Sequence, residues 1–270
     1  MTETTSKNRY HLLDSIRGLT LISMILYHGT WDLVYLYGVD WPWYHSVYAY
    51  IWQQSICWTF ILLSGFCWSM GKHHWKRGCM VFGGGAIITL VTLIAMPENR
   101  VVFGVLTLLG SCMLLMIPLH KWMVKWKPWI GLAGSSILFF LTGNVNYGYL
   151  GFEGWRFLKL PKVLYQGYFA TYIGFMDKDF YSTDYFPLLP WAFLFLMGYF
   201  LYQGLQKSGV VGNPQKLQTA KEDKKSVNRL EKLLQVNIKP LSFIGRHSLI
   251  IYMAHQAVLF VVLQTIFWKW

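Results

Sequence analysis

Charged residues are scarce in this 270-residue chain, where Asp, Glu, Lys and Arg together make up only 13%. A water-soluble domain carries about a quarter charged residues, because its surface faces water. Hydrophobic residues make up 54% of the chain and its mean hydropathy is +0.34. This composition excludes an ordinary soluble domain and predicts a protein whose surface lies largely in lipid.

Cysteines are also few, and none has a spacing that points to chemistry. All four lie in or beside apolar stretches, at Cys57, Cys67, Cys79 and Cys112. They have neither metal-ligand spacing nor the pattern of an extracellular disulfide framework, so we interpret them as packing residues and expect no metal. The chain has no internal repeat. No small-residue cleavage site follows the first apolar run, so we expect an uncleaved first helix.

Long apolar stretches, by contrast, fill most of the chain. A helix needs about 20 apolar residues to cross a hydrocarbon core of about 30 Å. Seven stretches approach this length, namely 11–37, 46–70, 78–96, 101–120, 128–142, 186–206 and 241–268, of which the fifth is the shortest. The sequence therefore predicts an all-α, polytopic membrane helical bundle with about seven transmembrane helices in a single domain over 1–270.

The basic residues indicate how these helices are oriented. With the N-terminus in the cytoplasm, 18 of the 24 Lys and Arg residues fall on the cytoplasmic side. An excess of Lys and Arg in cytoplasmic loops is the usual topology signal. The net charge of +12 is thereby explained by topology and by anionic membrane lipid, without nucleic acid. We predict a multi-pass protein of the cell membrane.

Two predicted segments do not span the membrane. Residues 207–240 are rich in Lys and are expected to form a cytoplasmic basic linker. Residues 143–185 are rich in aromatic residues and Gly, and are expected to form an extracytoplasmic cap segment. A loop of this length usually serves a function. It either binds an acceptor such as a carbohydrate or lies on the lipid headgroups, and part of it, 160–176, could be re-entrant.

The first apolar stretch carries four ionisable residues, Asp14, Arg17, His28 and Asp32. Ionisable groups in a spanning helix are costly and by default suggest a functional site. His28 lies eleven positions after Arg17, which is about three turns and roughly 16 Å, so both lie on one side of the helix. Asp14 and Asp32 share that side through i,i+3 and i,i+4 spacing.

This stripe suggests proton transfer at one end and anion binding at the other. A carboxylate at Asp32 would fix the tautomer of His28, leaving the other ring nitrogen free to take a proton. Arg17, near the cytoplasmic mouth, could hold a phosphate group. The alternative is structural, with a helix-end ion pair between Asp14 and Arg17 and a bundle-stabilising hydrogen bond between His28 and Asp32.

The last apolar stretch offers a second cluster. Ser248, Tyr252 and His255 follow one another at helical spacing and share a face, with Gln256 beside it and Arg246 at the cytoplasmic entrance. His255 could be catalytic or a buried structural residue. His45, in the first outer loop, could also reach the site.

Several segments carry a family resemblance. They are RYHLLDSIRGLTLISMILYH at 9–28, FILLSGF at 60–66, FGVLTLLGSCMLL at 103–115, STDYFPLLPWAFLFLMGY at 182–199 and IGRHSLIIYMAHQ at 244–256. Together, in this order and spacing, they resemble the heparan-alpha-glucosaminide N-acetyltransferase-like family in its short bacterial branch, within the transmembrane acyltransferase superfamily. Arg17 and His28 fall on the superfamily's Arg and His positions.

The resemblance implies a transmembrane acyltransferase that takes acetyl from acetyl-CoA and delivers it to an amine or hydroxyl of a saccharide-like acceptor across the membrane. Catalytic roles are expected for His28, Asp32, Arg17 and His255. Acetyl-CoA is expected at Arg17, Asp14, Arg246, Ser248 and Tyr252, and the acceptor at Asp184, Tyr185, Trp191 and His45. A homodimer is possible. The alternatives are a proton-coupled transporter of a small polar solute and a non-catalytic scaffold.

Overall fold

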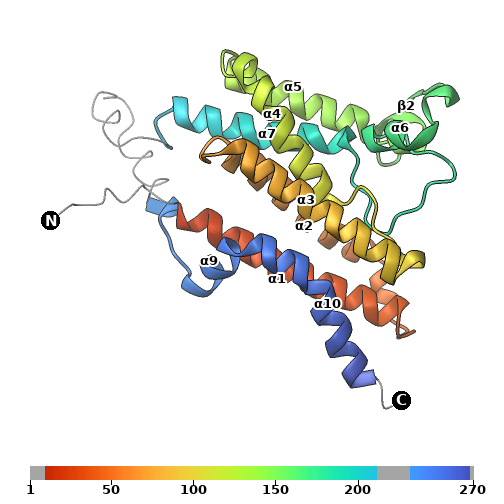
Figure 1. Ribbon diagram of the computed structural model, residues 1–270. Coiled ribbons are helices and arrows are strands. Elements are labelled where there is room, and N and C mark those ends of the chain that lie inside the picture. The colour runs from red at the N-terminus through yellow and green to blue at the C-terminus, as the bar shows by residue number, and fades with distance from the viewer. Residues whose placement is uncertain (1–9, 212–231, 268–270) are drawn as a thin grey trace. The chain divides into compact units, whose positions relative to one another are not determined.

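The computed structural model describes residues 10–211 and 232–267, and these are mostly helical (Figure 1). The chain divides into two compact units. Unit 1 comprises residues 1–60 and 206–270, and unit 2 comprises residues 61–205. Most of the predicted basic linker, residues 212–231, lies outside the described residues. Each unit is taken by itself below.

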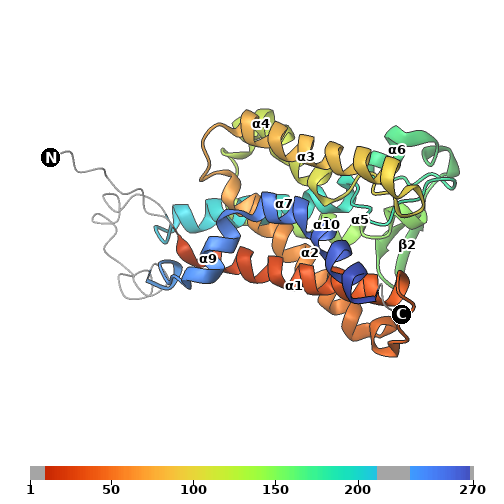
Figure 2. The same cartoon turned by 60° about the horizontal axis from the view of Figure 1, so that its bottom comes forward.

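Unit 1 is built around α1, which runs over His11–Tyr35. After the short 3-10 turn η1 (Pro42–His45), the chain enters α2 (Val47–Trp68), which crosses the division between the units. The C-terminal part of the chain returns as α9 (Lys239–Arg246) and α10 (Ser248–Phe267), and both pack on α1 (Figure 2). Segments more than 200 residues apart thus form one unit.

The stretch 241–268 was predicted as one helix, and this prediction is wrong. The chain breaks at His247, whose φ of −100° and ψ of 19° are not helical. The Phe243 carbonyl oxygen accepts from the His247 backbone N–H at 3.3 Å, and the Nδ1 atom of the His247 ring lies 2.9 Å from the same oxygen. The break lets α9 and α10 follow α1 as two separate rods.

Backbone contact at two glycines fixes α9 against α1. A Cβ atom at position 18 would lie 2.0 Å from the Leu241 carbonyl oxygen, and one at position 245 would lie 1.9 Å from the Asp14 carbonyl oxygen. No real Cβ atom tolerates these distances, so both positions need Gly. Small residues allow helices in lipid to approach this closely. The crossing brings Arg17 and Arg246, the neighbours of these glycines, to the same level.

Unit 2 holds the end of α2 and most of the long apolar helices. These are α3 (His74–Ala95), α4 (Val105–Met123), α5 (Pro128–Thr142) and α7 (Leu188–Lys207), whose last residues cross into unit 1. The 3-10 turn η2 (Pro97–Asn99) links α3 to α4. Here too glycines set the crossings, since a Cβ at Gly110 would meet the Phe82 backbone at 2.4 Å.

The predicted cap segment has structure of its own. After η3 (Val145–Tyr147) it forms an antiparallel hairpin from β1 (Tyr149–Phe152) and β2 (Trp155–Lys159), followed by η4 (Lys162–Leu164). The helix α6 (Gly167–Ile173) follows. At seven residues α6 is far too short to cross a core of about 30 Å. Within residues 10–211 and 232–267 the bundle is therefore all-α apart from this one hairpin.

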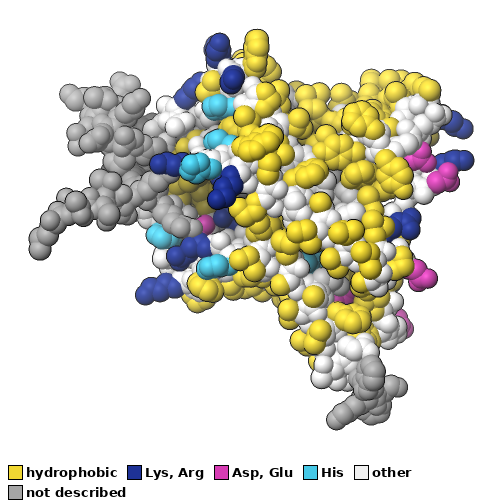
Figure 3. All heavy atoms as spheres, viewed as in Figure 1, with side chains coloured by type: hydrophobic (Ala, Val, Ile, Leu, Met, Phe, Trp, Pro, Cys, Tyr) yellow, Lys and Arg dark blue, Asp and Glu magenta, His cyan; other side chains and the backbone are white. Residues whose placement is uncertain are grey.

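Among the described residues, five helices are long and apolar enough to cross a membrane: α3, α4, α5 extended through Tyr147, α7 and α10. Figure 3 shows hydrophobic side chains spread over the visible surface, as expected of helices that face lipid. The helices α1 and α2, with 25 and 22 residues, are long enough but carry more polar side chains. The chain is an all-α membrane protein, and the count of seven spans stays a prediction.

Candidate active site

The polar stripe predicted along α1 exists, and its two ends have different surroundings. Asp14 and Asp32 are buried, whereas Arg17 and His28 keep part of their surface exposed. A compact apolar layer separates the two ends, built on Leu21 and Met24 of α1 and Ile56 of α2, with Ile251 and Tyr252 of α10 packed against it. The stripe is therefore two polar sites on one helix, separated by apolar packing.

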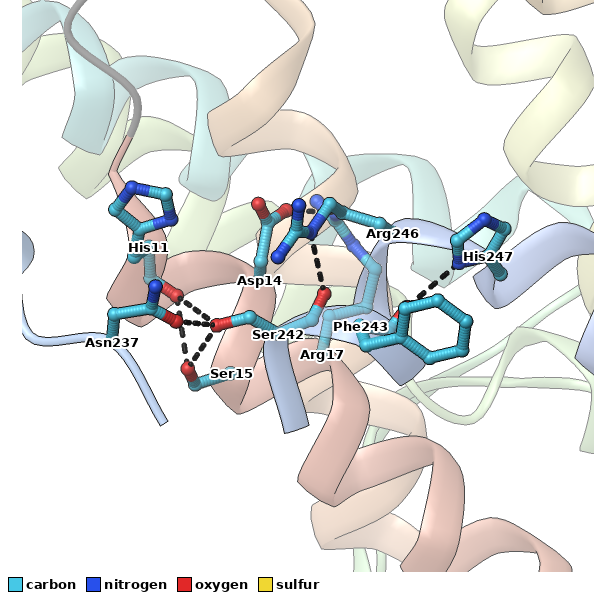
Figure 4. A network of polar contacts seen from close by, with 9 residues as sticks. All are labelled: His11, Asp14, Ser15, Arg17, Asn237, Ser242, Phe243, Arg246 and His247. Atoms are coloured by element: carbon cyan, nitrogen blue, oxygen red, sulfur yellow. Dashed lines mark hydrogen bonds and ion pairs between the residues drawn. The ribbon is translucent and has the colours of Figure 1, made fainter. Parts of the chain in front are cut away.

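The first end lies at the crossing of α1 and α9 (Figure 4). The Arg17 guanidinium lies 3.3 Å from the Asp14 carboxylate, in the predicted i,i+3 pair. The Arg246 Nε–H donates to the Ser242 carbonyl oxygen at 3.1 Å. Figure 4 shows both Arg side chains on the side of the crossing where the Asp14 carboxylate lies. Two guanidinium groups and one carboxylate leave this end with an excess of positive charge.

A buried hydroxyl network holds this end in place. The Ser15 and Ser242 hydroxyl oxygens lie 2.9 Å apart and join α1 to α9. Ser242 donates to the Asn237 amide oxygen at 2.6 Å, and Ser15 has one proton to donate either to the Ser242 hydroxyl or to the His11 carbonyl oxygen, which is 3.0 Å away (Figure 4). Buried polar groups that satisfy one another in this way define a single arrangement of the helices. The backbones that carry Arg17 and Arg246 are therefore held in one arrangement relative to each other.

At the second end the structure brings the two predicted histidines together. The ring centroids of His28 on α1 and His255 on α10 lie 4.9 Å apart, with an angle of 59° between the planes. His255 is only 9% exposed. Its Nδ1 contacts the Tyr252 carbonyl oxygen, which can only accept, so Nδ1 carries the proton. The other nitrogen, Nε2, then has a free lone pair, and it is buried without a hydrogen-bond partner.

The predicted pairing of Asp32 with His28 is wrong in this structure. The two Asp32 carboxylate oxygens accept hydrogen bonds from the Gln256 side-chain amide at 2.8 and 3.0 Å. Asp32 is completely buried. A buried carboxylate requires donors, and an amide that reaches both oxygens supplies them. Asp32 thus ties α1 to α10 at the residue next to His255, and it does not bond to the His28 ring.

An aromatic cluster borders His28 on the side of the loop that joins α1 to α2. Tyr27 packs against Tyr44 and Trp52, with ring centroids 5.5 and 5.2 Å apart, and the Trp52 indole N–H donates to the Ser23 hydroxyl at 2.7 Å. The Tyr44 hydroxyl is buried. The Tyr27 hydroxyl lies close enough to interact with it but not in good hydrogen-bond geometry. Burial raises the pKa of Tyr44, which keeps its hydroxyl protonated.

His45 and two of the predicted donor-binding residues lie around these two ends. His45 is exposed and makes edge contacts with the rings of Tyr35 and Tyr44. Tyr252 contributes the carbonyl that His255 bonds to, and its ring lies 5.3 Å from the His255 ring. Ser248 begins α10 and is partly exposed. The roles of these residues in binding stay predictions.

The other three residues predicted to bind the acceptor lie in unit 2, where each has a structural partner. Asp184 accepts a hydrogen bond from the Val105 backbone N–H at the start of α4, as an N-terminal cap does. Tyr185 donates to the Thr171 carbonyl oxygen at 2.6 Å. Trp191 packs on Phe139 and Phe186. Removal from water raises the pKa of Asp184 to about 6.

Sequence reasoning missed Tyr27 and Tyr44 and misjudged Gln256. Tyr27 is adjacent to His28, and Tyr44 lies in an aromatic run, WPWYH at 41–45, but nothing in that run marks one hydroxyl as buried. Gln256 was seen beside His255 without a role. A glutamine next to a histidine in an apolar helix was the available signal, because an amide there needs a buried partner.

Comparison with known proteins places these features in a family. A family model described as heparan-alpha-glucosaminide N-acetyltransferase, catalytic, matches residues 9–257, nearly the whole chain. The chain belongs to this family. The match covers both polar ends of α1, the crossing with α9 and the histidines of α1 and α10. No curated protein and no solved structure gives a significant match. Membership indicates a membrane acetyltransferase.

Proposed function

We propose that the protein transfers an acetyl group from cytoplasmic acetyl-CoA to an amine or hydroxyl of a saccharide-like acceptor on the opposite side of the cell membrane. The observation that carries the proposal is the contact between His28 and His255, with a buried, unpartnered Nε2 on His255. Burying a ring nitrogen without a partner costs free energy, and such costs are typical of sites that handle protons.

The donor binds at the crossing of α1 and α9. The residues there fit phosphate groups, because Arg17 and Arg246 supply planar guanidinium donors that recognise phosphate oxygens in pairs. Asp14 holds the Arg17 guanidinium from one side. Roughly 16 Å of helix then separates this end from His28. A donor anchored at the crossing by its phosphates extends along α1 toward the histidines with its thioester.

His28 is the general base in this proposal, since it is the more accessible of the two histidines. One ring nitrogen takes the proton from the acceptor amine or hydroxyl while the nitrogen or oxygen attacks the thioester carbonyl carbon. The carbon–sulfur bond breaks, and the departing thiolate receives the proton that the imidazolium holds. Protons and charge balance, and the ring returns to its neutral form. Transfer through an acetyl-histidine is the alternative route.

His255 and Asp32 do not take part in the proton transfer itself but position His28 for it. The free Nε2 lone pair of His255 is available to accept the other N–H of His28, which would fix the tautomer of the base. Asp32 then acts as a positioning residue, because its bonds to Gln256 hold α10 against α1 beside His255. This division of roles replaces the carboxylate–imidazole pair that the sequence suggested.

Thioester turnover by the purified protein tests the proposal. In detergent or nanodiscs, acetyl-CoA and an amino sugar should give free CoA and acetylated sugar. His28→Ala should lower kcat by about 10²–10⁴-fold, the usual contribution of a general base. Arg17→Ala should act differently and raise KM for acetyl-CoA. His73→Asn is the control, because His73 is exposed, lies before α3 in unit 2, and has a left-handed backbone conformation that Asn also adopts.

Three outcomes would decide against parts of the proposal. Full acetyl transfer by both His28→Ala and Arg17→Ala would contradict the assignment of the active site to α1. A burst of free CoA without acceptor, with the label retained on protein, would favour the acetyl-histidine route. If acetyl-CoA neither binds nor stabilises the protein while proteoliposomes move a polar solute, the protein is a transporter.

A further inference from the structure

The hairpin of unit 2 exposes large hydrophobic side chains although it is not a spanning helix. All five residues of β2 are exposed, including Trp155 at 58% and Phe157 at 67%. Both faces of β2 are exposed, because successive strand residues point to opposite faces. We use the name hairpin surface for the exposed hydrophobic residues on both faces and in the adjoining turns: Tyr147, Trp155, Phe157, Leu158, Val163 and Leu164. A group of exposed large hydrophobic side chains such as this one indicates contact with a membrane or with another protein.

The hydrophobic side chains of the hairpin are held in their exposed positions, because hydrogen bonds and ring contacts attach the hairpin to the end of α5. The buried Asn144 side chain donates to the Glu153 and Trp155 carbonyl oxygens at 3.0 and 2.9 Å, which closes the hairpin turn. The Tyr165 hydroxyl donates to the Val145 carbonyl oxygen at 2.6 Å. Phe152 of β1 packs on the rings of Phe139 and Phe140 of α5.

Basic residues alternate with these hydrophobic side chains. Arg156, Lys159 and Lys162 are all exposed, and the Arg156 guanidinium lies over the Tyr149 ring at 4.9 Å. Trp and Tyr are the residues that settle at the membrane–water interface, and Lys and Arg next to a membrane are attracted to anionic lipid. The chemistry of the hairpin surface thus matches phospholipid headgroups with the upper part of the chains below them.

The position of the hairpin points to the same partner. The exposed side of α5, which includes Ile137 and Phe140, belongs to a helix apolar enough to span the membrane. The hairpin begins at Tyr149, seven residues after α5 ends at Thr142, and packs on that end. The hairpin surface therefore continues the lipid-facing side of α5 at the depth where the span ends.

We propose that the hairpin surface lies in the headgroup layer of the bilayer and binds phospholipid. Its backbone limits the depth. A two-stranded sheet leaves unpaired N–H and C=O groups on its outer edge, and these are costly in hydrocarbon but satisfied by water and phosphate oxygens. The aromatic rings point into the upper chains while the strand edge and the three basic residues stay among the phosphates. This inference is independent of the acetyltransferase proposal.

Fluorescence quenching at single sites tests the inference. An environment-sensitive fluorescent amino acid introduced at Phe157 by codon suppression leaves all four cysteines in place. The protein is placed, one copy per disc, in phosphatidylcholine nanodiscs that contain phosphatidylglycerol and spin-labelled lipid. Asp179 is the matched control site, since its side chain is 82% exposed in the acidic loop after α6. Iodide reports exposure to water at both sites.

We expect blue-shifted emission at position 157, with stronger quenching by a headgroup spin label than by a mid-chain label and little quenching by iodide. Position 179 should show the reverse preference for iodide. Lys159→Gln with Lys162→Gln should remove the part of the lipid quenching that depends on phosphatidylglycerol. Equal iodide quenching at both positions would overturn the inference in favour of a hairpin in water. Shielding from every quencher would overturn it in favour of a hairpin packed against the rest of the same chain.

Discussion

Two close helix crossings, α1–α9 in unit 1 and α3–α4 in unit 2, are both built on glycines but differ in the side chains around them. At both, glycines let backbones touch, at Gly18 and Gly245 in the first and at Gly85 and Gly110 in the second. The first is surrounded by Asp14, Arg17, Ser15, Ser242 and Arg246. The second is lined by apolar side chains with Thr107 beside Gly85.

The difference shows that the packing of two helices does not require the charged groups found at one of the crossings. Close packing through small residues is sufficient to hold helices together in lipid, and α3–α4 achieves it without charged groups. The charged groups at α1–α9 add cost that packing does not require. We therefore predict a role in binding for these groups, and a functional role for His28 further along α1. The predictions below test whether the two crossings can be separated by experiment.

The largest effect is expected from blocking the crossings. Gly18→Val and Gly85→Val should each lower the free energy of unfolding by about 3 kcal/mol, because the added side chain meets backbone that cannot move aside. The activity that remains per folded molecule should differ. It should fall sharply in Gly18→Val, because Arg17 and Arg246 separate, and stay near wild type in Gly85→Val. Thermal unfolding in detergent, combined with turnover corrected for folded fraction, measures both.

Full turnover per folded molecule in both variants would contradict this prediction, since donor binding would then not depend on the α1–α9 crossing. An equal loss of turnover per folded molecule in both variants would also contradict it. Gly134→Ala is a control for substitution on a helix, because a Cβ at Gly134 would have open space.

A smaller effect is expected at the second polar end of unit 1, where donor and acceptor can be exchanged. Gln256→Glu places a second carboxylate against buried Asp32 and should destabilise the protein by about 2–3 kcal/mol while lowering kcat. Asp32→Asn alone should have a milder effect. The double variant restores one amide opposite one carboxylate and should recover most of the stability. A double-mutant cycle on unfolding free energy and on kcat measures the coupling.

Additive losses in that cycle would contradict a direct Asp32–Gln256 interaction. Recovery of stability without recovery of kcat would show that Asp32 has a role beyond holding α10 in place. In either case His28→Ala serves as the reference for complete loss of the base.

In unit 2 the titration of Asp184 should change the stability of the protein with pH and leave acetyl transfer unchanged. The folded protein raises the pKa of Asp184 from 3.8 to about 6, so it binds that proton more tightly than the unfolded chain does. The contribution of Asp184 to stability is therefore present at low pH and is lost as pH rises from about 4 to about 6. Asp184→Asn should flatten that part of the curve. Thermal unfolding at a series of pH values checks this, and an unchanged slope would contradict it.

The smallest effect is expected at Asp177, and it has the opposite sign. Backbone N–H groups of Gly167 and Asp179 donate to its carboxylate and lower its pKa, even though the side chain is at the surface. The contribution of Asp177 is present at neutral pH and is lost as pH falls through its ordinary range and below. Asp177→Asn should therefore lower Tm slightly at pH 7 and not at pH 3. A larger loss at pH 3 than at pH 7 would refute this sign.

The helices were predictable because length and hydropathy alone define them. The stretch 128–142 was predicted with the same bounds as α5, and 11–37 differs from α1 by two residues at its end. The prediction failed at 241–268 because the break at His247 is a change in the backbone angles of one residue, which hydropathy does not register. The hairpin was likewise missed, because its strands are short and exposed.

The site was predictable to the level of a single helix. Helical spacing placed Arg17 beside Asp14, and the ion pair is present. The same rule placed Asp32 beside His28, but Gln256 of α10, 224 residues away, takes both carboxylate oxygens. Spacing along one helix shows which side chains share a face. It does not show which partner on another helix competes for them, so the contact between His28 and His255 required the structure.

The central claim, that acetyl transfer occurs at the paired histidines of unit 1, is tested most directly by a structure with a non-hydrolysable acetyl-CoA analogue bound. We predict phosphate oxygens of the analogue in contact with the Arg17 and Arg246 guanidinium groups, and its acyl carbonyl carbon next to the rings of His28 and His255. An analogue whose acyl group lies away from both histidines, or whose phosphates contact neither Arg, would contradict the account.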